Sequence, residues 1–198
     1  MKKILITGAF GQLGTSLCKT LSNESILATG RSIVSSTKYK SIELDITNPK
    51  QVKGVIYKYN PDIIFNLAAQ SLVRESFKNP FNTWSTNFIG SLNLLEILKI
   101  RKRRKKITLV LITSDKCYKN INKSQGYKEN DILGGYEPYG ASKASVEILF
   151  HSYFQSFFKN DKKILMASAR AGNVIGGGDW SKDRIIPDLI KNLKKNNK

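Results

Sequence analysis

Tyr139 and Lys143 are side chains suited to proton transfer, and they stand four residues apart. In a helix this spacing places the phenol and the ammonium group on one face. A phenol keeps its proton at neutral pH, but a nearby cation favours the phenolate and lowers the pKa. Such a pair can take a proton from an alcohol, so we expect acid–base chemistry at Tyr139 and Lys143.

A second pattern consists of three glycines between an apolar run at 4–6 and a predicted helix that extends to about residue 21. Glycine permits a tight turn, and its missing side chain lets a pyrophosphate approach the backbone. The helix N-terminus adds free N–H groups and a favourable dipole. The pattern predicts a dinucleotide site, with a simple packing turn as the alternative. The residues of this turn expected to bind the cofactor are Gly8, Phe10, Gly11, Gln12, Leu13 and Gly14.

The end of the second predicted strand bears on the choice between NAD and NADP. An acidic residue there binds the ribose 2′-hydroxyl of NAD, whereas an arginine accommodates the 2′-phosphate of NADP. This chain has Gly30 and Arg31 at that place. We expect NAD, with NADP as the alternative because Arg31 could meet the 2′-phosphate. Arg31 equally suits a solvated surface position. Asp45 and Ile46 are expected to contact the adenine, although Asp45 also suits a turn or a helix N-cap.

Alternating strands and helices must position these residues. Short apolar runs predict strands at 4–6, 25–29, 41–44, 62–66, 107–112 and 163–169. Segments with an apolar stripe predict further helices at 49–59, 81–100 and 139–158. The alternation is typical of an α/β fold with a Rossmann-like, doubly wound parallel sheet flanked by helices. Segments 113–138 and 172–183 are predicted to be long functional loops.

Composition excludes several classes of protein. The 198 residues are 40% hydrophobic and 24% charged, which is typical of a globular chain rather than a disordered one. Cys18 and Cys117 cannot form a disulfide framework, and no Cys/His cluster suggests a metal site. A single histidine, His151, argues against histidine-based chemistry. No apolar run suits a membrane span or a signal peptide, so we expect a cytoplasmic protein.

The net charge of +18 invites a nucleic-acid hypothesis. The densest cluster is the run of six basic residues at 101–106, and the other excess lysines are scattered. We interpret the run as a solvated loop, so nucleic-acid binding is the lesser hypothesis. A basic protein also attracts anionic substrates such as nucleotides.

Several longer segments resemble the extended short-chain dehydrogenase/reductase superfamily and, within it, the CDP-glucose 4,6-dehydratases. The resemblance covers essentially the whole chain and corresponds to the N-terminal portion of that family. It rests on segments 67–74, 113–118, 126–131, 134–139, 170–180 and 183–188.

The resemblance implies a lyase that converts CDP-glucose to CDP-4-keto-6-deoxyglucose, a deoxysugar precursor for surface polysaccharide, through an internal redox cycle. Tyr139, assisted by Lys143, would deprotonate the sugar 4-hydroxyl, and Ser114 would hydrogen-bond the 4-oxygen. Asp115 would be the acid toward the 6-hydroxyl, and Lys116 the base at C5 if its pKa is lowered. Lysine at this place is characteristic of the CDP-glucose branch, with an ordinary surface lysine as the alternative.

The resemblance also assigns binding residues. The further residues implied for the cofactor are Leu67, Ala68, Ala69 and Asn87, beside Tyr139 and Lys143. Those implied for the substrate are Gln70, Ser71, Arg74, Asn173 and Arg184. Cys117 is expected to pack beside the site without reacting, and His151 to be structural.

The family pattern implies an NAD(P)-binding, catalytic domain at 1–172 and the start of a truncated substrate-binding region at 173–198. The C-terminal substrate domain would be largely missing, so we expect weak dinucleotide binding and poor turnover from these residues alone. The family also suggests a homodimer through the helices at 139–158 and 81–100. The aromatic residues that suggest this face are Tyr153, Phe154, Phe157 and Phe158, with an intramolecular core as the alternative.

Two other functions remain open. An epimerase or dehydratase that acts on another nucleotide sugar is the alternative among enzymes, although simple epimerases have no need of an acid–base pair at Asp115 and Lys116. A non-catalytic Rossmann protein that binds a partner through 101–106 is the alternative of another class. Ser114, Tyr139 and Lys143 together argue against it, because a pure binding module needs no such set.

Overall fold

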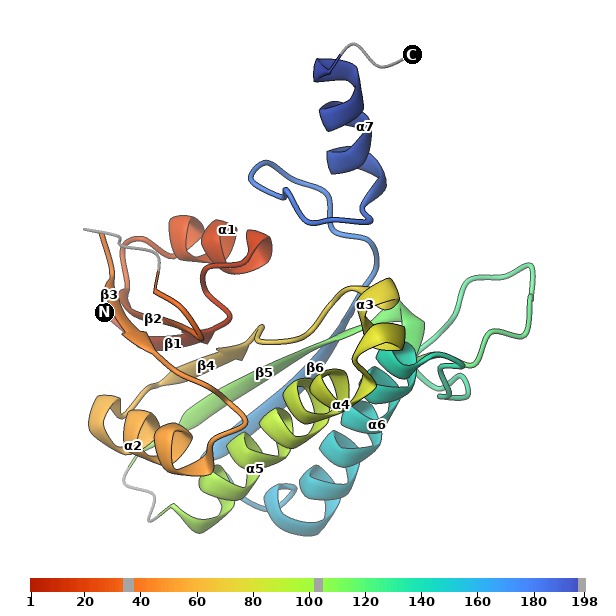
Figure 1. Ribbon diagram of the computed structural model, residues 1–198. Helices are drawn as coiled ribbons and strands as arrows, with labels where there is room; N and C mark the ends of the chain where they lie inside the picture. Colours follow the sequence, from red (N-terminus) through yellow and green to blue (C-terminus); the bar gives the residue numbers. More distant parts are fainter. Residues whose placement is uncertain (34–37, 102–104, 196–198) are drawn as a thin grey trace.

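A computed structural model describes residues 1–33, 38–101 and 105–195 (Figure 1). In this part of the chain, six strands form one all-parallel sheet in the order β3-β2-β1-β4-β5-β6. The strands are β1 (Lys3–Thr7), β2 (Ser25–Gly30), β3 (Lys40–Glu43), β4 (Ile63–Asn66), β5 (Ile107–Ser114) and β6 (Ile164–Ala171). The predicted Rossmann-like α/β fold is confirmed.

Helices connect these strands, and those predicted up to about residue 21 and at 49–59, 81–100 and 139–158 lie close to their predicted ranges. They are α1 (Gln12–Thr20), α2 (Pro49–Tyr59), α3 (Val73–Lys78), α4 (Pro80–Trp84), α5 (Gly90–Ile100), α6 (Pro138–Tyr153) and α7 (Ile185–Lys194). The helix predicted at 81–100 contains a π-helical turn at Ser85–Ile89 between α4 and α5. The helix predicted at 139–158 likewise ends in a π-helical turn, Phe154–Phe158, after α6.

The two faces of the sheet have separate apolar cores, because alternate strand residues point to opposite faces. Leu5 of β1 packs in the larger core with residues of α2, α5 and α6. Ile4 and Ile6 pack in the smaller core with Cys18 of α1. Figure 1 shows α1 on one side of the sheet and α2, α5 and α6 on the other, with α7 projecting beyond the sheet. The sheet is therefore covered by an apolar core on each face.

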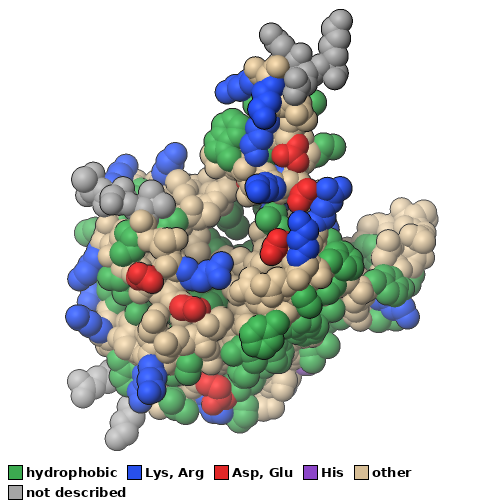
Figure 2. Space-filling model, viewed as in Figure 1, with side chains coloured by type: hydrophobic (Ala, Val, Ile, Leu, Met, Phe, Trp, Pro, Cys, Tyr) green, Lys and Arg blue, Asp and Glu red, His purple; other side chains and the backbone are tan. Residues whose placement is uncertain are grey.

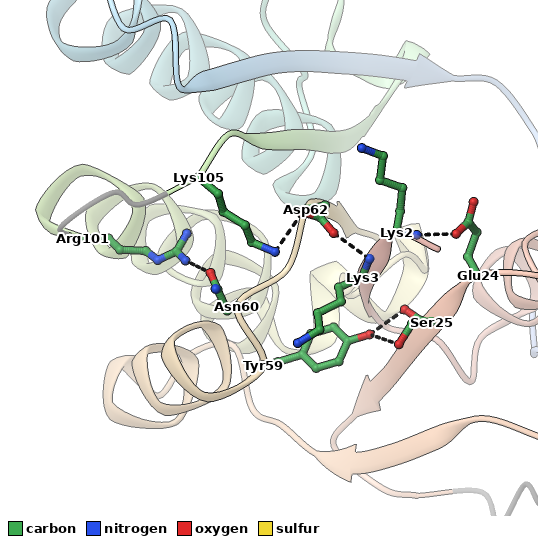
Figure 3. Close-up of polar contacts among 9 residues, drawn as sticks. All are labelled: Lys2, Lys3, Glu24, Ser25, Tyr59, Asn60, Asp62, Arg101 and Lys105. Atoms are coloured by element: carbon green, nitrogen blue, oxygen red, sulfur yellow. Dashed lines mark hydrogen bonds and ion pairs between the residues drawn. The ribbon is translucent and has the colours of Figure 1, made fainter.

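The amino ends of the strands contain a polar cluster that involves the basic run at 101–106 (Figure 3). Asp62 accepts hydrogen bonds from the backbone N–H of Lys3 and from Lys105 Nζ, both at 2.8 Å. Arg101 is only 8% exposed and donates to the side chain of Asn60. The solvated-loop interpretation is therefore wrong for Arg101, which the fold buries. Residues 102–104 of the run lie outside the described residues.

The aromatic residues suggested for a dimer face belong mostly to the interior. Phe158 is buried in the larger core, and Tyr153 and Phe154 pack against that core. Phe157 is half exposed. Tyr153, Phe154 and Phe158 therefore contribute to the core of this chain, as the alternative to a dimer face proposed.

Candidate active site

A cleft of about 1120 Å³ opens at the carboxyl ends of the strands, the usual ligand position in an open α/β sheet. The β1–α1 turn, the ends of β2 to β5, the start of α6 and the segment 171–187 line it. In the space-filling view the molecule is hollowed between the part that contains α1 and the base of the projecting α7 (Figure 2).

The β1–α1 turn packs tightly at two glycines, where no side chain fits. Gly8 has φ +66°, and a Cβ there would lie 2.7 Å from the Ala68 nitrogen. A Cβ on Gly14 would lie 2.4 Å from the Gly8 carbonyl oxygen. Helix α1 begins at Gln12, and among the described residues no side chain caps its N-terminus. Its first N–H groups are therefore free to bind a phosphate, so the turn fits a dinucleotide.

The rim beside β2 and β3 contains the residues expected near the adenosine. Gly30 lies against the ring of Phe10, and Arg31 lines the cleft. Asp45 Oδ1 accepts from the backbone N–H of Thr47 at 2.9 Å and from its hydroxyl at 2.8 Å. Asp45 is therefore a turn residue that also lines the cleft, so both interpretations of it fit. Ile46 is buried and lines the cleft beside it.

Tyr139 and Lys143 lie in the first turns of α6. The Glu137 carboxylate caps this helix by accepting from the N–H groups of Tyr139 (2.6 Å) and Gly140 (2.8 Å). Lys143 Nζ donates to the Ile112 carbonyl oxygen at 3.0 Å. Both side chains line the cleft while being almost fully buried. The i,i+4 spacing thus places the pair where it was predicted.

The electrostatics of this pair differ from the prediction. Burial raises the pKa of Tyr139, although a hydrogen bond with Ser114 and the charge of Arg184 oppose that rise. Burial lowers the pKa of Lys143 to about 8, and the negative charge of Glu147 opposes that fall. The prediction that Lys143 lowers the pKa of Tyr139 is therefore wrong in this structure, because burial outweighs the neighbouring charges.

The end of β5 supplies the second group of expected catalytic residues. Ser114 Oγ donates to Asp115 Oδ1 at 3.1 Å and accepts from the Lys116 N–H at 3.3 Å. Lys116 Nζ lies 3.7 Å from Asp115 Oδ1 and donates to Asn173 Oδ1 at 3.5 Å. Ser114, Lys116 and Asn173 line the cleft, whereas Asp115 lies beside it on an adjoining groove. Proton donors and acceptors thus gather within one short turn.

Cys117 follows this turn and is fully buried. Burial raises the pKa of its thiol to about 11. The thiol is therefore protonated at neutral pH and a poor nucleophile, which agrees with the expected packing role.

Asn87 and Gln70 lie behind the wall of the cleft. The Asn87 side chain accepts from the Gln70 N–H at 2.9 Å and donates to the Gln70 carbonyl at 3.1 Å. It also donates to Ser142 Oγ on α6 at 2.8 Å. Asn87 therefore ties the loop after β4 to the helix of Tyr139. Contacts of Asn87 with the cofactor and of Gln70 with the substrate stay predictions.

The remaining residues expected to bind substrate meet across the mouth of the cleft. Arg74 Nη1 forms an ion pair with Asp183 at 2.8 Å. Arg184 Nη2 donates to Ser71 Oγ at 3.3 Å. The Arg184 Nε atom is buried and has no hydrogen-bond partner among the described residues. These contacts join the segment just before α7 to α3 and to the loop that precedes it.

The sequence analysis missed a buried polar group beneath the site, formed by Thr113, Glu147 and Arg170. The Thr113 hydroxyl donates to Glu147, and Arg170 Nη2 donates to Glu147 Oε2 at 2.9 Å. Glu147 stands four residues after Lys143, so the helical spacing that identified Lys143 could also have indicated Glu147.

Within residues 1–33, 38–101 and 105–195, no three His, Cys, Asp or Glu side chains are grouped to hold a metal ion. Over the same residues, no helix has both the length and the apolar character needed to cross a membrane. His151 is exposed on α6, away from the cleft.

Comparison with known proteins gives consistent matches. The sequence model of the family described as GDP-mannose 4,6 dehydratase matches residues 5–173. CDP-glucose 4,6-dehydratase of Salmonella typhimurium is 37% identical over 98% of this chain and 58% of that protein. dTDP-D-glucose 4,6-dehydratase of Dictyostelium discoideum is 29% identical over 100% of this chain and 49% of that protein.

A similar solved structure is that of UDP-glucuronic acid 4-epimerase from Bacillus cereus in complex with UDP-glucuronic acid and NAD. Its TM-score is 0.82 at 25% identity, with 98% of this chain and 63% of that chain covered. The chain spans about half the length of the curated relatives that it matches.

Proposed function

This chain belongs to the GDP-mannose 4,6 dehydratase family of nucleotide-sugar dehydratases and epimerases, and from that premise we propose that it forms the catalytic half of a CDP-glucose 4,6-dehydratase. The observation that supports the proposal is the Ser114–Asp115–Lys116 turn, of which Ser114 and Lys116 line the cleft with Tyr139 while Asp115 lies beside it. Simple removal of an alcohol proton needs only Tyr139 and its neighbours. Elimination of water needs a further acid and base, which Asp115 and Lys116 supply.

We propose that the β1–α1 turn, Arg31 and the Asp45–Ile46 pair hold NAD or NADP. When bound, this cofactor supplies the reversible redox chemistry of the reaction. Gly8 and Gly14 let the β1–α1 turn pack tightly against its own backbone and the start of the loop after β4, and the uncapped N-terminus of α1 supplies N–H donors for the pyrophosphate. The buried floor formed by Tyr139 and Lys143 excludes water from the reacting end.

The proposed roles of this chain's side chains are those that the family resemblance implies for them. Tyr139 in its phenolate form takes the proton of the sugar 4-hydroxyl, and Ser114 holds the 4-oxygen by a hydrogen bond. Once C4 is a ketone, the C5 proton is acidic and moves to the neutral amine of Lys116. Asp115 in its protonated form gives its proton to the departing 6-hydroxyl, so water leaves. Lys116 Nζ and Asp115 Oδ1 lie 3.7 Å apart, so the proposed base and acid are neighbours in the structure.

The direct test is an assay with CDP-glucose and NAD+ that follows the alkaline absorbance of the 4-keto-6-deoxy product. The 198-residue chain is compared with a version extended by the C-terminal region of a relative, because the chain spans about half of those proteins. We expect product from the extended version and little from the 198 residues. If neither version acts on CDP-glucose but either acts on another nucleotide sugar, the substrate assignment is wrong and the family assignment stands.

The cofactor preference gives a prediction that does not depend on turnover. We expect Arg31→Asp to change the ratio of the NADP+ and NAD+ dissociation constants at least about 10-fold in favour of NAD+, because it replaces a cation with a carboxylate beside the ribose. Calorimetric titration with each dinucleotide measures both constants. Lys19→Asp at the end of α1 is the matched control for the charge change and should leave the ratio unaltered. An unaltered ratio in Arg31→Asp would show that Arg31 is a surface residue only.

The homodimer through the helices at 81–100 and 139–158 remains part of the proposal. Phe81, Ile89 and Ile148 are exposed apolar residues on these segments and support it. Phe157, half exposed after α6, is a further exposed apolar residue on these segments.

A further inference from the structure

Glu147 is a carboxylate placed in an interior position, and the proposed proton transfers give it no role. It lies on α6 and is only 4% exposed. Its oxygens accept hydrogen bonds from Thr113 on β5 and from Ser168 and Arg170 on β6. A buried carboxylate is costly unless it is paired and hydrogen-bonded, and these three donors meet that need.

Thr113, the β5 residue that donates to Glu147, stands between two residues that contact the expected catalytic pair. Thr113 follows Ile112, whose carbonyl accepts from Lys143, and precedes Ser114, which interacts with Tyr139. The Thr113 hydroxyl donates to Glu147. Glu147 therefore fastens the end of β5 to α6 at the place where both Lys143 and Tyr139 dock.

Arg170 connects the same carboxylate to the loop after Lys116. It pairs with Thr113 in the register of β5 and β6. Its Nη1 donates to Tyr118 Oη and to the Glu129 carbonyl oxygen, both at 2.9 Å. The guanidinium also lies over the Tyr118 ring, 4.9 Å from its centroid. The pair of Glu147 and Arg170 thus joins α6, β5, β6 and the loop that begins at Asp115.

We infer that Glu147 and Arg170 are a pair of positioning residues that sets the charge of Lys143 and holds it against the end of β5. The inference rests on the proposed function only for the catalytic importance of Lys143. Its charge effect and its geometry belong to this chain whatever the substrate.

The charged groups around Lys143 decide the sign of the effect. Glu147 lies on the same face of α6, with Tyr139 one turn earlier on that helix. Arg170 lies on β6, and Asp115 and Lys116 follow β5. The negative charge of Glu147 favours the protonated ammonium, whereas burial disfavours it. Arg170 opposes Glu147, because its positive charge lies 2.9 Å from the carboxylate.

The test is the pH titration of the Lys143 side chain by nuclear magnetic resonance, followed at Cε and Nζ and assigned by the signal that Lys143→Arg removes. For Glu147→Gln we expect the midpoint to fall by about one pH unit or more, because an opposing charge is lost. For Arg170→Gln we expect it to rise, because Glu147 then acts on Lys143 without its partner. A purely structural role does not produce shifts of opposite sign.

Glu96→Gln is the control, because Glu96 on α5 also binds a lysine and a tyrosine but lies away from the cleft. It should leave the midpoint unchanged. An unshifted midpoint in Glu147→Gln overturns the inference, and so does a shift of equal size in Glu96→Gln. If Glu147→Gln does not fold, Arg170→Gln decides, and an unchanged or lowered midpoint there overturns the inference. The titration needs no substrate, so its outcome is separate from that of the CDP-glucose assay.

Discussion

Tyr139→Phe is expected to lower kcat of the proposed dehydratase by about 10²–10⁴-fold, the range typical of a lost acid–base group. The change removes one hydroxyl and keeps the ring. Tyr139 is 8% exposed and lines the cleft, and burial raises its pKa, so the phenol must give up its own proton before it can take one from the sugar. Without that oxygen, the proposed route for the sugar 4-hydroxyl proton is lost, whereas binding contacts elsewhere in the cleft remain.

The measurement uses whichever version of the chain turns over CDP-glucose, with kcat and KM determined separately. KM should change much less than kcat, because the phenol acts on the reacting proton. Tyr136→Phe is the matched control, since Tyr136 precedes the same helix but is 78% exposed. It should retain full activity. A Tyr139→Phe variant that kept a tenth or more of the wild-type kcat would remove Tyr139 from the proposed role.

Much of the fold was predictable because its signals are local. Helix α2 begins at Pro49 after the Asn48 cap and ends before Asn60, whose φ of 53° lies in the left-handed region. These residues mark a helix start and stop in any sequence. Short apolar runs likewise predicted the strands, because a parallel sheet buries both faces of each strand.

Helix α3 was not predicted, because it spans only Val73–Lys78 and Leu72 provides no side-chain cap. Six residues are too few to show an apolar period. The π-helical turns at Ser85–Ile89 and Phe154–Phe158 were not predicted either. They depend on how each helix packs along its length, and periodicity over a long segment does not record a single inserted residue.

Motif spacing predicted which residues line the site, but it did not predict how deeply they are buried or which groups surround them. Spacing indicates that Tyr139 and Lys143 share a helix face, but it does not give the burial that raises one pKa and lowers the other. Arg101 and Glu147 have charged side chains typical of a surface, yet the fold buries both. Their partners, Asn60 and Arg170, are distant in sequence, so only the tertiary structure brings them together.

Gly14→Ala is the second change from which we expect a large effect. A Cβ there would lie 2.4 Å from the Gly8 carbonyl oxygen and 2.6 Å from the Ala9 Cα. These are backbone atoms, so no side-chain rotation relieves the clash, and the β1–α1 turn must shift. We expect the free energy of unfolding to fall by about 1–3 kcal/mol, as for other overpacked sites. We also expect dinucleotide affinity to fall at least about 10-fold, because the same turn shapes the proposed phosphate site.

Gly54→Ala in α2 is the matched control, because it makes the same substitution in a helix where a Cβ would meet no atom within 4 Å. Alanine favours a helix over glycine by about 1 kcal/mol, so Gly54→Ala should stabilise the protein and leave dinucleotide binding unchanged. Alanine is also favoured over glycine in the helix at position 14. A net loss of stability in Gly14→Ala therefore means that the clash costs more than this gain. Urea unfolding and calorimetric titration of both variants provide the comparison. If Gly14→Ala gained stability as Gly54→Ala does, the close packing of the β1–α1 turn, and with it the proposed cofactor site, would be wrong.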